Sequence, residues 1–154
     1  MTPKQWLTQF AGVVARARGG QWTHALIRWF VGKYHVNMDE AAQPDITQYA
    51  CFNDFFTRAL KPGARPLADA AFVCPVDGAI SQLGPIQGDQ IFQAKGHTYS
   101  TQALVGGDAA LAAQFQDGDF ATIYLSPKDY HRIHMPSAGP VSYTHLTLPT
   151  NREV

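Results

Sequence analysis

The sequence is poor in cysteine and has no excess of charge of either sign. Its 154 residues include two cysteines, Cys51 and Cys74. These are too far apart for a metal-binding knuckle and too few for a disulfide framework, so we expect two buried, reduced thiols. The 12 basic and 12 acidic residues give a formal net charge of zero. That balance argues against a general nucleic-acid-binding protein.

No apolar run in the sequence is long enough to span a bilayer. A transmembrane helix requires about 20 mainly apolar residues, and Arg16, Arg18 and Arg28 interrupt the N-terminal stretch. The basic start, apolar segment and cleavage site of a signal peptide are not recognisable either, so we expect none. An apolar content of 45% in a chain of this length supports one domain with a real core.

Acidic residues are missing from the N-terminal quarter. None precedes Asp39, whereas five basic residues do: Lys4, Arg16, Arg18, Arg28 and Lys33. Apolar residues at helical spacing predict two amphipathic helices, separated by Gly19-Gly20, with Thr23 capping the second. Both helices carry tryptophan, and this composition suits helices lying on an anionic membrane. The alternatives are helices packed on the domain core or forming a dimer interface.

The remainder of the chain predicts short helices and strands. Asp77-Gly78 lies between two apolar runs, residues 72–76 and 79–83, and so predicts a β-hairpin. Asn53 is placed to cap a short helix that carries two phenylalanines, and Asp108 to cap a helix that runs through Phe115. The fold class predicted is therefore α+β, with N-terminal amphipathic helices followed by an antiparallel β core.

Polar and titratable side chains are concentrated after one apolar strand. The strand, Phe120 to Leu125, is broken by Ser126-Pro127. The residues that follow are Lys128, Asp129, Tyr130, His131, Arg132 and His134. A rigid strand ending in a polar turn is a common way to build a site, although an exposed loop without a function is an equal alternative. A metal hydrolase using His131, His134 and Asp77 is a weaker alternative, because His-x-x-His lacks a third ligand at a telling spacing.

Five stretches occur in the order and spacing of the phosphatidylserine decarboxylase family, over residues 5–141. They are Phe52-Asn-Asp-Phe-Phe-Thr-Arg58, Leu60-Lys-Pro-Gly-Ala-Arg-Pro66, Pro75-Val-Asp-Gly78 with Ile80-Ser81, Gln93-Ala-Lys-Gly-His-Thr-Tyr-Ser100 and Tyr124-Leu-Ser-Pro-Lys-Asp-Tyr-His-Arg-Ile-His-Met-Pro136. Any one of these motifs is weak, but five in register are specific. The chain thus resembles the prokaryotic-type proenzymes of this family.

The resemblance implies a partition of the chain. Residues 1–38 would be a membrane-associated helical region, and residues 39–141 the N-terminal part of the catalytic domain. Residues 142–154 contain nothing that resembles the family and are interpreted as a foreign or artefactual tail. The β core would therefore be truncated before its second half. Open strand edges predict low stability for such a chain.

The resemblance also implies an activity and the residues that perform it. The family is pyruvoyl-dependent: a serine that follows a glycine cleaves its own chain and becomes a pyruvoyl group, which then decarboxylates phosphatidylserine to phosphatidylethanolamine. By match to the motifs, Asp77 and His134 would assist self-cleavage, while His131 would act near the substrate during decarboxylation. Neutral imidazole suits both steps because it can accept and return a proton. No metal is implied.

The serine that forms the pyruvoyl group has no match, because no serine in this sequence follows a glycine. The chain is therefore expected to be an inactive fragment that depends on the missing C-terminal (alpha) part of the proenzyme. The other partners implied are phosphatidylserine in an anionic membrane surface and, as one alternative, a second copy in a homodimer. Its expected location is peripheral, on the cytoplasmic face of a bacterial cell membrane. A non-catalytic membrane-binding module is the alternative function.

Overall fold

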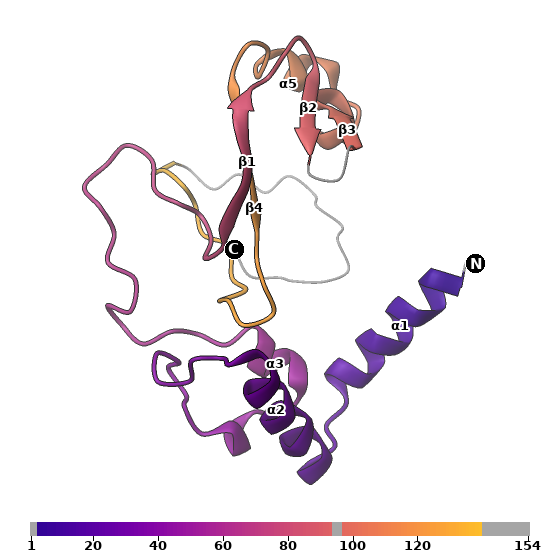
Figure 1. The fold of residues 1–154 in the computed structure, drawn as a ribbon, viewed down its shortest axis with the longest axis vertical. Helices are drawn as coiled ribbons and strands as arrows, with labels where there is room; N and C mark the ends of the chain where they lie inside the picture. Colours follow the sequence, from indigo (N-terminus) through magenta and orange to yellow (C-terminus); the bar gives the residue numbers. More distant parts are fainter. Residues whose placement is uncertain (1–2, 94–96, 140–154) are drawn as a thin grey trace. The chain divides into compact units, whose positions relative to one another are not determined.

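The computed structural model describes residues 3–93 and 97–139, and the chain divides into two compact units (Figure 1). Of the described residues, one unit contains 3–77 and 126–139, and the other contains 78–93 and 97–125. Helices and short antiparallel strands together confirm the predicted α+β class. The tail predicted at residues 142–154 lies outside the described residues, so its boundary stays a prediction.

Two helices open the chain, as predicted: α1 (Pro3–Arg16) and α2 (Gln21–Tyr34). Thr23 is not the cap of α2, however, because the helix begins two residues earlier and its N-cap is Gly20. A φ of 53° at Gly20, which glycine adopts without strain, allows the chain to turn there. The buried Thr23 instead accepts a hydrogen bond of 3.0 Å from the Gly19 N–H. It therefore stabilises the turn before α2 from inside the helix.

The core of the first unit is aromatic. Helix α2 packs on the short helix α3 (Phe52–Phe56), and the turn η1 (Ile46–Gln48) closes the cluster. The buried residues are Ile27, Val36, Tyr49 and Phe55, and around them pack Phe30, Val31, Tyr34, Met38, Ile46, Phe52 and Phe56. Phe30 meets the rings of α3 edge-on, at centroid distances of 5.0–6.1 Å. Such packing fixes the position of α3. The N-cap of α3 is Cys51, so the prediction of Asn53 as its cap is wrong.

The apolar face of α1 is exposed. Its large apolar side chains are Trp6, Leu7, Phe10, Val13 and Val14, of which Leu7 is 70% and Phe10 68% exposed. In α2, Trp22 is also 85% exposed. None of the described helices has the length and apolar character needed to cross a bilayer. Helix α1 thus presents an uncovered apolar face within the described part of the chain.

The second unit contains two antiparallel strand pairs. Strand β1 (Ala79–Pro85) pairs with β4 (Asp119–Tyr124), and β2 (Gln90–Gln93) pairs with β3 (His97–Ser100). Two short helices follow β3 in the chain and precede β4: α4 (Thr101–Leu104) and α5 (Ala109–Ala113). Asp108 caps α5 as predicted, through a hydrogen bond of 3.0 Å from Leu111 N–H, but the helix ends two residues before the expected Phe115. The small core contains Ile86, Ile91, Thr101 and Ala112.

The prediction of a β-hairpin at Asp77-Gly78 is wrong. Residues 72–76 form no strand, and β1 pairs with β4 instead. The glycine serves a different purpose: a Cβ at Gly78 would lie 2.7 Å from the Tyr124 carbonyl oxygen, so only glycine fits beside the end of β4. The expectation of two buried thiols is also corrected, since Cys51 is buried but Cys74 is exposed.

We predict that replacing Phe55 by alanine destabilises the chain by about 3–5 kcal/mol, because this fully buried ring anchors α3 to α2. Urea unfolding followed by circular dichroism measures the change. The matched control is Phe72→Ala, which removes a ring that is 76% exposed and should change stability by less than about 0.5 kcal/mol. Equal effects of the two substitutions would contradict the packing of Phe55 between α3 and α2.

Candidate active site

The candidate site is built on the loop of residues 126–136, which we name the histidine loop. The loop begins with a turn closed from both sides. The backbone N–H of Ser126 donates to a carboxylate oxygen of Asp129 at 2.6 Å, and the N–H of Asp129 donates back to the Ser126 carbonyl at 2.9 Å. Pro127 inside this turn restricts the backbone further. The turn therefore gives the following residues a defined starting geometry.

Two arginines attach the histidine loop to the C-terminal end of α3. Arg58, just after α3, donates from Nη2 to the Lys128 carbonyl at 3.3 Å. In the opposite direction, Arg132 of the loop donates from Nε to the Thr57 carbonyl at 2.8 Å. The contacts are reciprocal, since each segment supplies one side chain and one carbonyl. They hold a loop about 70 residues distant in sequence against the aromatic core.

The Arg58 side chain is almost completely buried, with 2% of the residue exposed. Burial lowers the pKa of its guanidinium, and nearby Tyr49, Glu40 and Asp77 partly oppose that change. The group lies 5.5 Å from the centroid of the Phe55 ring, a cation–π arrangement that offsets part of the desolvation. Arginine tolerates such burial better than lysine, because its charge is delocalised and weakly hydrated.

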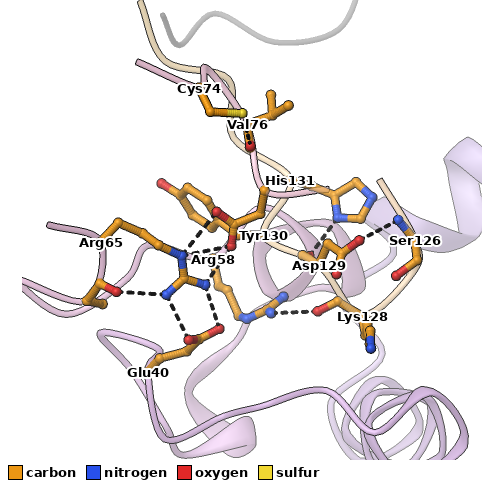
Figure 2. A network of polar contacts seen from close by, with 12 residues as sticks. Glu40, Arg58, Arg65, Cys74, Val76, Ser126, Lys128, Asp129, Tyr130 and His131 are labelled. Atoms are coloured by element: carbon orange, nitrogen blue, oxygen red, sulfur yellow. Dashed lines mark hydrogen bonds and ion pairs between the residues drawn. The ribbon is translucent and has the colours of Figure 1, made fainter. Parts of the chain in front are cut away.

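His131 is fixed by contacts on its ring and at one nitrogen. Its ring lies 4.1 Å, centroid to centroid, from the ring of Phe56. Nδ1 lies 2.8 Å from the carbonyl oxygen of Asp129 (Figure 2). A carbonyl oxygen can only accept, so Nδ1 carries the hydrogen. In the neutral ring, Nε2 of His131 is then the atom that can accept a proton.

His134 lies on a segment that pairs with the residues before Asp77. Its backbone N–H donates to the Pro75 carbonyl at 2.8 Å, and the N–H of Val73 donates to the Pro136 carbonyl at 2.8 Å. These two bonds run in antiparallel register and bring the Pro-Val-Asp-Gly stretch alongside the second histidine. The Nε2 atom of His134 lies 3.1 Å from the Tyr130 hydroxyl.

Asp77 is held by Arg65, not by a histidine. The carboxylate of Asp77 accepts from Nε and Nη2 of Arg65, at distances between 2.5 and 3.0 Å. The other edge of the guanidinium, Nη1 and Nη2, donates to both oxygens of Glu40, at 2.9 and 3.1 Å, and Nη1 also donates to the Ala64 carbonyl at 2.8 Å. All five N–H donors of Arg65 are therefore used (Figure 2). Hydrogen bonds to Asp77 and then Glu40 raise the pKa of Arg65, so it stays charged.

The structure thus brings the three predicted site residues onto adjacent segments of one unit, but not into one hydrogen-bonded set. The contacts found among the described residues pair Asp77 with Arg65, His134 with Tyr130, and His131 with Asp129. The catalytic roles inferred for Asp77, His131 and His134 stay predictions. Within residues 3–93 and 97–139 there is no cluster of three His, Cys, Asp or Glu side chains suited to a metal ion, so the metal-hydrolase alternative gains no support there.

Sequence reasoning gave no role to Arg58 or Arg65, and it named Tyr130 only as one of the polar residues that follow the strand. Arg58 and Arg65 do lie in two of the stretches that carry the family resemblance, and Tyr130 directly precedes His131. Their positions in or beside these motifs were the signal by which the sequence could have indicated them. Burial of Arg58 and Tyr130 could not be read from the sequence, since both are residue types that usually keep a polar group in water.

We predict a measurable, salt-sensitive coupling between Arg65 and Asp77. A double-mutant cycle of Arg65→Gln and Asp77→Asn, read by urea unfolding, should give up to about 1 kcal/mol, because the pair is partly exposed to solvent. Raising the salt concentration should weaken it. The raised pKa of Arg65 keeps its share of the stability through neutral and mildly alkaline pH, with loss only above the ordinary arginine range. The control cycle, Arg65 with Asp129→Asn, should show no coupling; equal coupling in both cycles would refute the pairing.

Comparison with known proteins identifies the family. The family model described as phosphatidylserine decarboxylase matches residues 52–147, and a second, described as PSD, matches residues 1–35. Proteins named phosphatidylserine decarboxylase proenzyme are similar to 90% of the chain: that of Acidovorax ebreus is 73% identical, and that of Herminiimonas arsenicoxydans 70% identical, each over 139 residues. The chain spans about half the length of these curated relatives, 49% and 47% respectively. The chain belongs to the phosphatidylserine decarboxylase family.

Proposed function

We propose that this chain is the N-terminal part of a phosphatidylserine decarboxylase proenzyme, and that it supplies the acid–base residues for self-cleavage and decarboxylation. The observation that carries the proposal is the antiparallel pairing of residues 73–75 with residues 134–136. It places the segment of Asp77 next to that of His134, although the two stretches are far apart in sequence. A carboxylate and an imidazole on neighbouring segments are the groups that activate a hydroxyl nucleophile.

The self-cleavage reaction needs a serine from outside the matched sequence. A serine hydroxyl is a weak nucleophile until a base removes its proton. His134 would accept that proton, and Asp77 would orient the histidine and stabilise its charged form. Because Arg65 holds Asp77 and Tyr130 contacts His134 in this chain, the arriving segment would have to exchange at least one of these contacts.

The pyruvoyl group expected from the family would derive from that serine, so no residue of this chain becomes the group. When present, it supplies an electrophilic carbonyl that binds the substrate amine and accepts electrons as carbon dioxide leaves. Decarboxylation at such a group also needs a residue that carries a proton, and His131 of this chain fits that need. His131 keeps Nδ1–H on the Asp129 carbonyl and leaves Nε2 to accept or return a proton.

The function is tested in a proenzyme made by completing this chain with the second half of the Acidovorax ebreus relative. We predict that self-cleavage, followed by gel electrophoresis, slows by at least about 100-fold in His134→Ala and Asp77→Asn, since both remove acid–base assistance. His131→Ala should instead cleave but release little carbon dioxide from phosphatidylserine.

The control variant is His24→Ala, which removes a histidine of α2 that lies outside the candidate site and should cleave normally. The 154-residue chain alone should contain no covalently bound pyruvoyl group by mass spectrometry. Unimpaired cleavage in His134→Ala, or a pyruvoyl group on the isolated chain, would overturn the proposal.

We further propose that the N-terminal helices bind an anionic membrane surface, so that the protein is peripheral on the cytoplasmic face of a bacterial cell membrane. Support comes from the exposed apolar face of α1, with Phe10 and Val13 each more than two-thirds exposed, and from Trp22. The five basic residues before Asp39 are not balanced by any acidic residue in that segment of the sequence. Each basic residue near such a surface adds about 1 kcal/mol of binding. A dimer interface made by α1 is the second candidate.

Liposome sedimentation tests the membrane proposal. We predict that the chain sediments with vesicles containing phosphatidylserine more than with neutral vesicles, because binding combines apolar insertion with charge. The double variant Leu7→Ser, Phe10→Ser should lose binding. The control, Leu67→Ser with Phe72→Ser, removes two side chains of similar exposure outside the helices and should bind normally. Equal binding to both vesicle types would contradict the role of the basic residues. A chain that dimerises and does not bind either vesicle type would favour the dimer interface made by α1.

A further inference from the structure

We propose that Tyr130 is a positioning residue for His134, whose hydroxyl holds Nε2 and sets the ring in the tautomer that carries hydrogen on Nδ1. The inference rests on the proposed role of His134 as the base in self-cleavage and assigns a function to a residue outside the predicted set. Two independent contacts support it: a hydrogen bond between the side chains and a stacking of their rings.

The contacts join two residues four positions apart in the histidine loop. The Tyr130 hydroxyl lies 3.1 Å from Nε2 of His134. The two rings lie nearly parallel, with an interplanar angle of 22° and centroids 5.6 Å apart. A single hydrogen bond would allow the imidazole to rotate about it, and a stacked ring alone would not select a nitrogen. Together they fix both the plane of the ring and the nitrogen that faces Tyr130.

The burial of Tyr130 indicates that its hydroxyl donates the hydrogen bond to Nε2 of His134. Tyr130 is only 7% exposed, whereas His134 is exposed. A buried hydroxyl requires a partner, because leaving its O–H unpaired carries a desolvation cost. The partner found for it in the described chain is Nε2 of His134. The neutral imidazole accepts at this atom, which leaves the ring hydrogen on Nδ1.

The tautomer matches the chemistry of the proposed reaction. A carboxylate that orients a catalytic histidine accepts from Nδ1–H, and Nε2 is the atom that takes the proton of the nucleophile. Tyr130 thus occupies the nitrogen that the serine hydroxyl needs, and a serine that displaces it meets a ring already in the correct form. The arrangement removes the need to reorient His134 when the second half of the proenzyme docks.

Nuclear magnetic resonance of the 154-residue chain with ¹⁵N-labelled histidine rings tests the contact directly, at a pH where the rings are neutral. We expect the Nδ1–H pattern for His134 in the wild-type chain and a shift toward Nε2–H in Tyr130→Phe, which keeps the ring but removes the hydroxyl. Tyr99→Phe, at a half-exposed tyrosine of β3, should leave the pattern unchanged. His131 is the internal reference, since its Nδ1–H is bound to the Asp129 carbonyl in this chain and neither substitution removes that contact.

The outcomes separate this inference from the proposed function. An unchanged His134 tautomer in Tyr130→Phe overturns it, as does a wild-type chain in which neither histidine shows a fixed tautomer. In the completed proenzyme, Tyr130→Phe should also slow self-cleavage by up to about 10-fold, because without the hydroxyl hydrogen bond fewer His134 rings start in the Nδ1–H tautomer, while Tyr99→Phe cleaves normally. Normal cleavage in His134→Ala would instead remove the proposed function while leaving the tautomer result intact. A tautomer shift with no change in cleavage rate would reduce Tyr130 to a structural residue and so also overturns the inference.

Discussion

The candidate site depends on the reciprocal attachment of the histidine loop to α3 by Arg58 and Arg132. Each arginine donates to a backbone carbonyl of the other segment, so neither contact requires a particular side chain opposite it. Burying a guanidinium is costly unless it is hydrogen-bonded. Arg58 offsets the cost through the Lys128 carbonyl and the face of Phe55. Because α3 is itself packed in the aromatic core, hydrogen bonds to its C-terminal end hold the histidine loop in a defined position. A loop without this support would be an ordinary surface turn.

Local chemistry made much of this fold predictable. The helices of the first 34 residues follow from apolar periodicity, the cap at Asp108 from its side chain, and the strand before Ser126-Pro127 from an apolar run that meets a proline. The hairpin at Asp77-Gly78 failed for a tertiary reason. Its aspartate is held by Arg65, and the strand after its glycine pairs with β4, which lies about 40 residues further along the chain. Neither partner can be recognised from the dipeptide.

For the candidate site, the resemblance of the motifs to the family suggested Asp77, His131 and His134. The structure places all three in one unit on adjacent segments, and their catalytic roles stay predictions. Their hydrogen-bond partners were not predictable, because these depend on distances between segments that a sequence does not contain. Each of the three polar groups already has a partner within the chain. These hydrogen bonds leave none of the three polar groups unpaired, which lowers the free-energy cost of holding them close together.

The β1–β4 pair carries apolar side chains that the described part of the chain does not cover. A two-stranded ribbon is marginal in water unless one face is covered. Here Ile80, Leu83 and Tyr124 are each more than 60% exposed. Apolar side chains on an uncovered pair of strands gain free energy when further chain covers them. The curated relatives are about twice as long as the region they share with this chain. Covering this ribbon with further chain would therefore be favourable by itself, whatever contacts the polar groups of the chain make.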